Sequence, residues 1–333
     1  MKKSIFALAL GAASLFSSFV SAGQEYLFFS PQAIESHLRG YSEDEKAAIG
    51  KDLDVVRSVC SYNTAESEKI EKPLYLATAG GPGARKSTIL ERFLRDHSLV
   101  SKTTYIDPDQ RALKFMSHTY CSQSLSALAI GDYENYAMAV KDAYEKWRGA
   151  SNFIALTLLE DSFLHKKNIA HGTTLTGEHT PQFLAKVKDA GYDITLLLCS
   201  CEDAFRKKAI QYRNEEQKFY QSTPEDAIIK GKLFPQRMPA YFTYADTLYL
   251  YWSDDLATQE RLAAVLQDGD LKILDVQALN LFIQKFENDR ELLNVERKQI
   301  PSWDELVNLY RTNRKFIGKC DTVRLSCFYL GHL

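Results

Sequence analysis

A glycine-rich segment at residues 80–87 has the residue types and the spacing of a phosphate-binding loop. Gly80 is followed by four residues and then by Arg85-Lys86-Ser87, close to the P-loop pattern of glycine, four residues, glycine, lysine and serine or threonine. In such a loop the backbone N–H groups surround phosphates, the lysine contacts the β- and γ-phosphates, and the hydroxyl binds Mg²⁺. The residues expected to bind a nucleotide are Gly80, Gly81, Gly83, Ala84, Arg85, Lys86, Ser87 and Thr88, with Ser87 as the Mg²⁺ ligand.

One position departs from this pattern, because Arg85 stands where the second glycine is expected. A glycine there spares a crowded backbone a Cβ atom. An arginine either narrows the loop or adds a positive charge for the phosphates, and the sequence does not choose between these two outcomes.

The residues on both sides of the loop predict the elements that must position it. Leu74–Ala79 is a short apolar run typical of a buried strand, and Lys86–Asp96 has an apolar face at helical spacing. A strand before the loop and a helix after it form the context that supports a P-loop. A glycine-rich turn that binds nothing is the alternative interpretation.

Asp107 follows the next predicted strand, Thr103–Ile106. It therefore stands at the carboxyl end of a strand, the edge at which ligands bind in parallel α/β sheets. Asp-Pro pairs are also common turn formers, so a turn with Pro108 is the alternative interpretation.

Two arginines in the predicted helix 202–220 are further candidates for phosphate contacts. Arg206 and Arg213 are seven residues apart and therefore lie on one helical face. A solvated helix face produces the same pattern. Three basic residues follow in the region expected to form a lid: Lys230, Lys232 and Arg237.

With the loop and Asp107 together, residues 70–252 resemble the zeta toxin family of P-loop small-molecule kinases. That family has an Ile-Asp-x-Asp motif after its second strand, and Ile106-Asp107-Pro108-Asp109 stands at the matching distance from Lys86. The resemblance implies that ATP is the phosphate donor and that Asp107 is the base on the substrate hydroxyl. Family members phosphorylate the sugar of UDP-N-acetylglucosamine, so a nucleotide sugar is one expected acceptor.

The later motifs of the family are matched in part. Arg213, in Ile210-Gln211-Tyr212-Arg213, takes the place of a lid arginine, so the resemblance implies a catalytic role for it beside Lys86 and Asp107. His171-Gly172-Thr173 stands where the family has Glu-Gly-Thr, and a histidine there is more often a packing or hydrogen-bonding residue than a catalyst. Gln221 stands where a second arginine precedes a Thr-Pro pair.

Alternating apolar runs and helical patterns predict the α/β class: a P-loop kinase-like parallel sheet flanked by helices, with a helical N-terminal and an α+β C-terminal extension. The expected segments are a signal peptide at 1–22, a helical segment at 23–72, the kinase-like domain at 73–252 and the extension at 253–333. Further strands are expected at 168–170, 193–199, 247–252 and 271–276, and helices at 42–60, 131–166, 180–190, 277–296 and 302–312.

The first 22 residues have the pattern of a secretory signal. Lys2 and Lys3 precede an apolar run, and Val20-Ser21-Ala22 offers a cleavage site, so we expect export with a mature start at Gly23 and a periplasmic or secreted location. An uncleaved membrane anchor is the alternative. In an oxidising compartment we expect a Cys320–Cys327 disulfide, with Cys199 and Cys201 as buried thiols and a metal site there as the alternative.

Composition restricts the partners. The chain has 333 residues, of which 45% are hydrophobic, and a formal net charge of −2, which argues against nucleic acid as the main partner. We expect a small-molecule substrate, no membrane contact after signal cleavage, and an antitoxin or host protein as a further candidate partner. Two hypotheses follow: an ATP-dependent kinase that acts as an exported toxin or effector, or an inactive nucleotide- or ligand-binding protein on the same fold.

Overall fold

The computed structural model describes residues 28–60, 72–129, 133–216, 222–295 and 299–314. Contacts divide the chain into two compact units. One unit comprises the described residues up to Cys60 together with Arg111–His165, and the other comprises the described residues of Ser61–Gln110 and those from Lys166 onward. The predicted signal peptide, Gln221, Cys320 and Cys327 lie outside the described residues.

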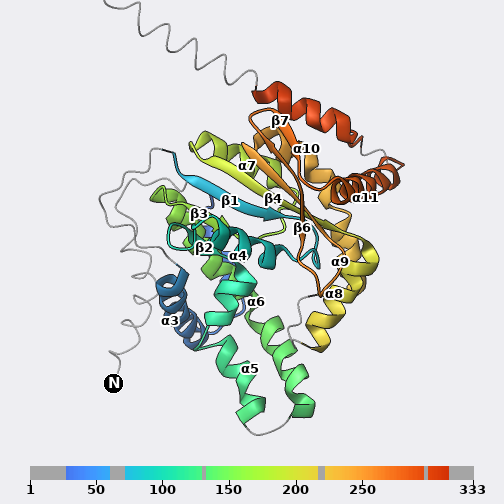
Figure 1. Cartoon of the computed structure of the whole chain (residues 1–333). Coiled ribbons are helices and arrows are strands. Elements are labelled where there is room, and N and C mark those ends of the chain that lie inside the picture. Colours follow the sequence, from blue (N-terminus) through green and yellow to red (C-terminus); the bar gives the residue numbers. More distant parts are fainter. Residues whose placement is uncertain (1–27, 61–71, 130–132, 217–221, 296–298, 315–333) are drawn as a thin grey trace, which may run out of the picture. The chain divides into compact units, whose positions relative to one another are not determined.

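The second unit is built on one seven-stranded sheet in the order β2-β3-β1-β4-β5-β6-β7 (Figure 1). β1 to β5 run parallel, and β6 and β7 are antiparallel additions at one edge. The strands are β1 (Leu74–Ala79), β2 (Thr104–Ile106), β3 (Ile169–His171), β4 (Asp193–Cys201), β5 (Thr247–Ser253), β6 (Arg261–Gln267) and β7 (Asp270–Ile273). This confirms the predicted α/β sheet, and the boundary expected at residue 252 falls within β5, before the last residue of that strand.

β6 is the strand that the sequence analysis missed. Its alanine-rich sequence has little of the β-branched and aromatic character of strands. The turn after it was the available signal, since Asp268 and Gly269 both have positive φ, as a two-residue type I′ hairpin requires. An Asp-Gly pair between apolar runs is a strong hairpin signal.

Helices cover both faces of the sheet, which is why its central strands are continuously apolar. Leu197 and Cys199 of β4 lie in one cluster with the apolar face of α4 (Lys86–Asp96). Leu196 and Leu198 point to the opposite face and are equally buried. The remaining helices of this unit are α7 (Thr180–Asp189), α8 (Asp203–Glu215), α9 (Pro224–Gly231), α10 (Phe234–Tyr244), α11 (Val276–Asn294) and a helix at 303–314.

The first unit is helical. It contains α2 (Pro31–Glu35), η1 (Ser36–Leu38), α3 (Glu43–Cys60), α5 (Tyr120–Ala129) and α6 (Tyr133–Leu164), and the π-helical Pro108–Leu113 precedes α5. The predicted capped helix is confirmed, because Ser42 Oγ accepts from Glu45 N at 3.2 Å and Glu45 Oε2 accepts from Ser42 N at 2.8 Å. Among the helices that the structure describes, none is both long and apolar enough to cross a membrane.

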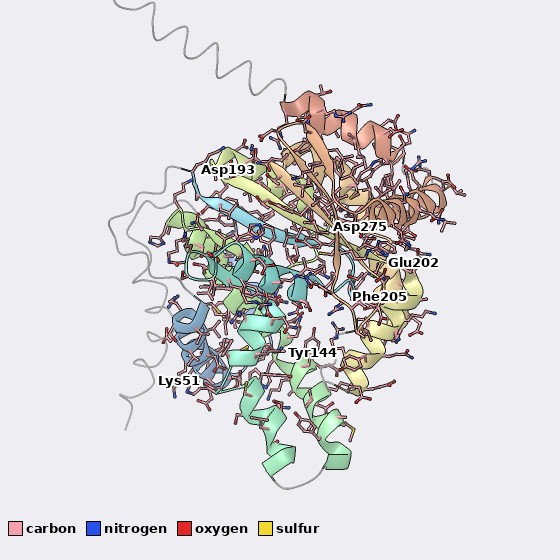
Figure 2. All side chains as sticks on the ribbon, in the orientation of Figure 1. Lys51, Tyr144, Asp193, Glu202, Phe205 and Asp275 are labelled. Carbon is pink, nitrogen blue, oxygen red and sulfur yellow. The ribbon has the colours of Figure 1, made fainter. Side chains whose placement is uncertain are left out.

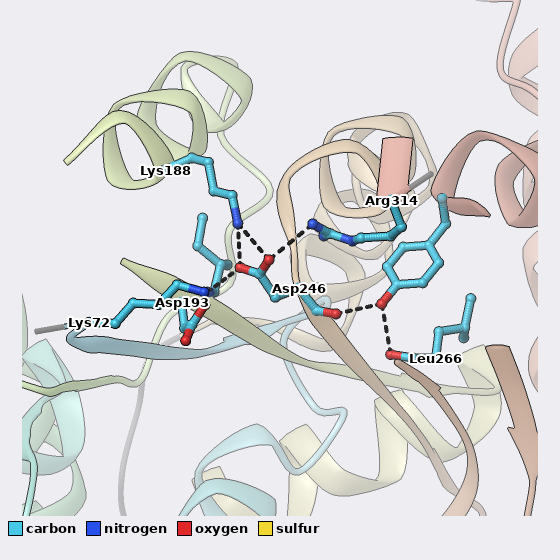
Figure 3. A network of polar contacts seen from close by, with 8 residues as sticks. Lys72, Lys188, Asp193, Asp246, Leu266 and Arg314 are labelled. Atoms are coloured by element: carbon cyan, nitrogen blue, oxygen red, sulfur yellow. Dashed lines mark hydrogen bonds and ion pairs between the residues drawn. The ribbon is translucent and has the colours of Figure 1, made fainter. Parts of the chain in front are cut away.

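A polar network fastens the C-terminal helix to the start of β5 (Figure 3). The Asp246 carboxylate binds Lys188 Nζ at 2.5 and 2.6 Å and Arg314 Nη1 at 3.0 Å, and it also accepts from the Ile194 backbone N–H. The Tyr310 hydroxyl donates to the carbonyl oxygen of Asp246 at 2.5 Å. The network joins β4, β5, α7 and the C-terminal helix at the edge where the parallel strands begin, opposite to the phosphate loop.

We predict that Asp246→Ala lowers the free energy of unfolding by about 2 kcal/mol, because it leaves two partly buried cations without their carboxylate. Urea denaturation followed by circular dichroism measures the change. Lys230→Ala is the control, since its ion pair with Asp226 is about half exposed and should contribute below ~1 kcal/mol. Equal losses in the two variants would contradict the prediction.

Candidate active site

The phosphate loop turns out of the end of β1 and is fitted between its two neighbouring strands. Gly80 N donates to Thr174 O at 3.0 Å, on the side of β3. Gly80 has φ +142°, and a Cβ atom on it would collide with the Cys199 carbonyl oxygen of β4. Gly83 also has positive φ, at +80°. Glycine is therefore required at both positions, for close approach at the first and for backbone conformation at the second.

Arg85 occupies the left-handed region with φ +54°, the conformation that makes glycine the usual residue here. Its guanidinium lies against the segment between β5 and β6. It donates to Thr258 O at 2.8 Å and to Asp255 O at 3.1 Å, and its Nε lies 2.6 Å from the Glu260 carboxylate. These contacts offset the backbone strain and occupy the side chain.

Glu260 is a residue of the site surroundings that sequence reasoning missed. Its side chain is 1% exposed and lies between two guanidinium groups, those of Arg85 and Arg92, with Arg92 Nη2 at 2.5 Å. A single glutamate before an unrecognised strand carries no sequence signal. These two ion pairs attach both the loop and α4 to the residue that directly precedes β6.

Lys86 is the first residue of α4 and is half-buried within the loop. Its Nζ donates to Gly81 O at 2.9 Å. Burial lowers the pKa of Lys86 to about 8, and the positive charges of Arg206 and Arg213 contribute to the lowering. Ser87 and Thr88 follow in the first turn of α4, which has no side-chain cap. The first N–H groups of any helix have no intrahelical acceptor, and here no side chain caps them, so they suit an anion.

Asp107 lies at the carboxyl end of β2 and is 7% exposed. Its Oδ1 accepts from the backbone N–H groups of Asp109 and Gln110, both at 2.8 Å. Burial, with the charge of Asp109, raises the pKa of Asp107 to about 6. A Cβ atom on Gly172 would collide with Asp107 Oδ2, so the glycine of the His171-Gly172-Thr173 motif leaves room for this carboxylate.

Lys86 and Asp107 are close enough for each to shift the pKa of the other. Asp107 favours the protonated form of Lys86, and Lys86 lowers the pKa of Asp107 against the effect of burial. The strand order places β3 between β2 and β1, so the two residues leave the same edge of the sheet. A half-buried cation and a buried carboxylate at that edge suit the transfer of a phosphoryl group to a hydroxyl.

The two arginines of α8 have different surroundings. α8 begins directly after β4, and Glu202 and Phe205 mark its start in Figure 2. Arg206, in its first two turns, is 4% exposed and donates through Nη1 to Pro82 O at 2.7 Å. Arg213, near the end of the helix, is half-buried and donates to Ser222 Oγ at 3.3 Å. Arg206 thus contacts the phosphate loop, which the sequence did not distinguish from a position on a solvated face.

Three of the other candidates, His171, Lys230 and Arg237, have structural partners. His171 Nδ1 lies 2.8 Å from the Tyr75 hydroxyl, and burial lowers the pKa of His171 to about 4, so its ring is neutral at pH 7. Arg237 Nε donates to Gly177 O at 2.8 Å. Lys230 pairs with Asp226 at 2.5 Å, and Lys232 is exposed.

The two cysteines of β4 are buried thiols, as expected. Both side chains are fully buried, and burial raises the pKa of each thiol. Across the part of the chain that the structure describes, there is no group of three or more His, Cys, Asp or Glu residues that could hold a metal ion. A metal bound chiefly by nucleotide phosphates needs few protein ligands, and the Ser87 hydroxyl at the head of α4 suits that role.

Comparison with known proteins finds similarity in fold. No protein-family model matches the chain, and no curated protein matches it in sequence. The structure of AvrRxo1-ORF1:-ORF2 with ATP is 13% identical, with a TM-score of 0.51, and the match covers 86% of this chain and 96% of that one.

Two more solved structures score lower. The native AvrRxo1-ORF1:-ORF2 complex is 13% identical over 86% of this chain and 95% of that one, with a TM-score of 0.49. A structure from the PezAT chromosomal toxin–antitoxin system of Streptococcus pneumoniae is 17% identical over 78% of this chain and 96% of that one, with a TM-score of 0.44. At such identities the first match shows the fold alone: the chain has a P-loop kinase-like α/β fold.

Proposed function

We propose that this protein is a kinase that transfers the γ-phosphate of ATP to a hydroxyl group of a small molecule. The observation that carries the proposal is that Lys86 of the phosphate loop and the buried Asp107 leave the same edge of the sheet. The similarity in fold to a structure with bound ATP supports the choice of nucleotide.

The proposed roles follow from charge and position. Backbone N–H groups of residues 83–87 bind the phosphates, and Lys86 neutralises charge on the β- and γ-phosphates. Mg²⁺ bound with ATP supplies further neutralisation, and Ser87 is its proposed protein ligand. Asp107 accepts the proton of the attacking hydroxyl, and Arg213 stabilises charge on the transferred group.

The pKa values of the two central residues suit these roles at neutral pH. With a pKa of about 6, Asp107 is mostly ionised at pH 7 and is a stronger base than an ordinary aspartate. With a pKa of about 8, Lys86 is mostly protonated at pH 7. A bound phosphate would favour its protonated form further.

The acceptor and the partners are proposed from the resemblance to the zeta toxins. We propose a nucleotide sugar as one acceptor, since the family phosphorylates such a substrate. An antitoxin or host protein is a proposed partner, and the AvrRxo1-ORF1:-ORF2 structure with a similar fold is itself a complex of two components.

An inactive nucleotide- or ligand-binding protein is the second candidate. The observation in its favour is that His171 replaces the family's glutamate and is neutral and bound to Tyr75. Such a protein would bind ATP and form no phosphorylated product. Incubation with ATP and candidate acceptors, followed by mass spectrometry of the small molecules, distinguishes the two functions.

Substitution of Lys86 tests the nucleotide site. Lys86→Ala removes the lysine cation of the loop, so ATP affinity should fall by about 100-fold or more, since charged hydrogen bonds to phosphate are among the stronger ones. Isothermal titration calorimetry with ATP and Mg²⁺ measures it. Lys208→Ala, an exposed position on α8, should bind as the wild type does. Equal affinity in wild type and Lys86→Ala would exclude the loop as the nucleotide site.

Asp107 is tested by its substitution and by pH. Asp107→Asn should keep ATP affinity within a few-fold and lower turnover by about 10² or more, the usual effect of a lost base. Because the base must be ionised and Lys86 must be protonated, kcat/KM of the wild type should rise with pH through about 6 and fall again above about 8. Asp189→Asn, on an exposed helix end, is the control. Turnover of Asp107→Asn near the wild-type rate would remove Asp107 from the mechanism.

Export is a separate proposal and rests on Lys2, Lys3 and the apolar run that follows them. We propose that the chain is cleaved before Gly23 and reaches an oxidising compartment, and that it acts as a toxin or effector where ATP is available inside another cell. Mass spectrometry of protein from its native host, alkylated before reduction, should find a Gly23 start and a Cys320–Cys327 disulfide. An intact Met1 would refute cleavage, and six alkylated cysteines would refute the disulfide.

A further inference from the structure

The guanidinium of Arg206 lies between the phosphate loop and α9. On one side it donates to Pro82 O at 2.7 Å, and a Cβ atom on Gly81 would collide with its Nη1. On the other side a Cβ atom on Gly231, the last residue of α9, would lie 2.9 Å from its Cζ. Gly83 also packs against the stem of the same side chain. Three glycines thus make room for one arginine.

A chain of alternating charges reaches Arg206 from α11. Asp203 Oδ1 lies 3.6 Å from Arg206 Nε and 3.3 Å from Lys285 Nζ, and Lys285 binds Asp289 at 2.7 Å. Arg206 Nε is buried and has no hydrogen-bond partner within the described residues. A buried cation needs a counter-charge. Asp203 supplies it and helps to fix where the guanidinium lies, and Lys285 in turn holds Asp203.

The hydrogen bond to Pro82 O determines how the loop presents its N–H groups. A trans peptide is planar, so its carbonyl oxygen and the following N–H point in opposite directions. With the Pro82 carbonyl directed at Arg206, the Gly83 N–H points away from Arg206. A loop that binds phosphate needs its N–H groups turned inward and its carbonyl groups turned outward.

We propose that Arg206 is a positioning residue of the phosphate loop: it fixes the peptide between Pro82 and Gly83, and its contact with Gly231 makes phosphate affinity depend on the packing of α9. The consequence for ATP rests on the proposed function. The effect of Arg206 on the position of the loop does not rest on the proposed function, so the positioning role and the kinase function can be tested separately.

Gly231→Ala tests the link to α9 without altering the arginine. Alanine has the higher helix propensity, so a purely local effect would leave the protein as stable or make it more stable. The added Cβ atom would instead crowd Cζ of Arg206 and displace the guanidinium from the loop. Ile229→Ala, at an exposed position on the same helix, is the matched control.

The experiment is hydrogen–deuterium exchange of the protein without ligand, with thermal unfolding of each variant. Arg206→Met and Gly231→Ala should speed exchange of the peptide covering residues 80–87 by about tenfold, the effect of losing a charged hydrogen bond. Arg206→Lys should show a smaller change, because it keeps the charge and loses the planar fork. Exchange in β4 should not change, and neither Lys208→Met nor Ile229→Ala should affect the loop.

ATP calorimetry on the same variants separates this inference from the proposed function. Arg206→Met should weaken ATP binding by about tenfold or more. Unchanged loop exchange in Arg206→Met would overturn the inference even if Lys86→Ala abolished ATP binding. Faster loop exchange in the Arg206→Met variant, together with a wild type that binds no ATP, would support the positioning role and refute the kinase. If Arg206→Met speeds exchange throughout the unit, Gly231→Ala decides: unchanged loop exchange in that variant overturns the link to α9.

Discussion

The close approach of Gly80 to the Cys199 carbonyl oxygen is the constraint on which the candidate site depends. Only a residue without a Cβ atom fits there, so the chain can leave β1 directly against the neighbouring strand and still turn into α4. The hydrogen bond from Gly80 N to Thr174 O holds the other side of the turn. Because contacts on the β3 side and on the β4 side both fix the position of Gly80, α4 begins with Lys86 at the edge of the sheet where β2 ends before Asp107.

The charges around this turn are unevenly distributed. Lys86, Arg206 and Arg213 are near enough for the two arginines to lower the pKa of the lysine, while Asp107 is the carboxylate that acts in the opposite direction. An excess of positive charge that is wholly or partly buried is costly without an anion. The same arrangement therefore suits a phosphorylated ligand. The positive charge of Lys86 also lowers the pKa of Asp107, which burial raises.

The arginine at position 85 illustrates how a local departure can be accommodated at a distance. Its left-handed backbone is strained for any residue with a Cβ atom. The buried Glu260 carboxylate and two carbonyl groups of the segment before β6 bind its side chain. The antiparallel strands at the end of the chain thus support the loop as well as extending the sheet.

Local sequence determined the elements that frame the site. The apolar run of β1 and the helical spacing of α4 depend on neighbours in the chain, and both elements were predicted with their observed bounds. In the other unit, the capping box of α3 is equally local, and that helix was predicted within one residue. The strand end before Asp107 followed from the same patterns, whereas the strand predicted at 168–170 was observed one residue later, at Ile169–His171.

Tertiary structure decided which side chains meet. Arg206 and Arg213 share one helical face, yet only the packing of α8 against the loop brings Arg206 to Pro82. The reason that Gly172 is needed is the Asp107 carboxylate, 65 residues earlier in the chain. The pKa of Asp107 depends on burial, and Glu260 acquires its role from two arginines more than 160 residues away. A sequence pattern reports spacing along one element, whereas these contacts depend on how separate elements pack.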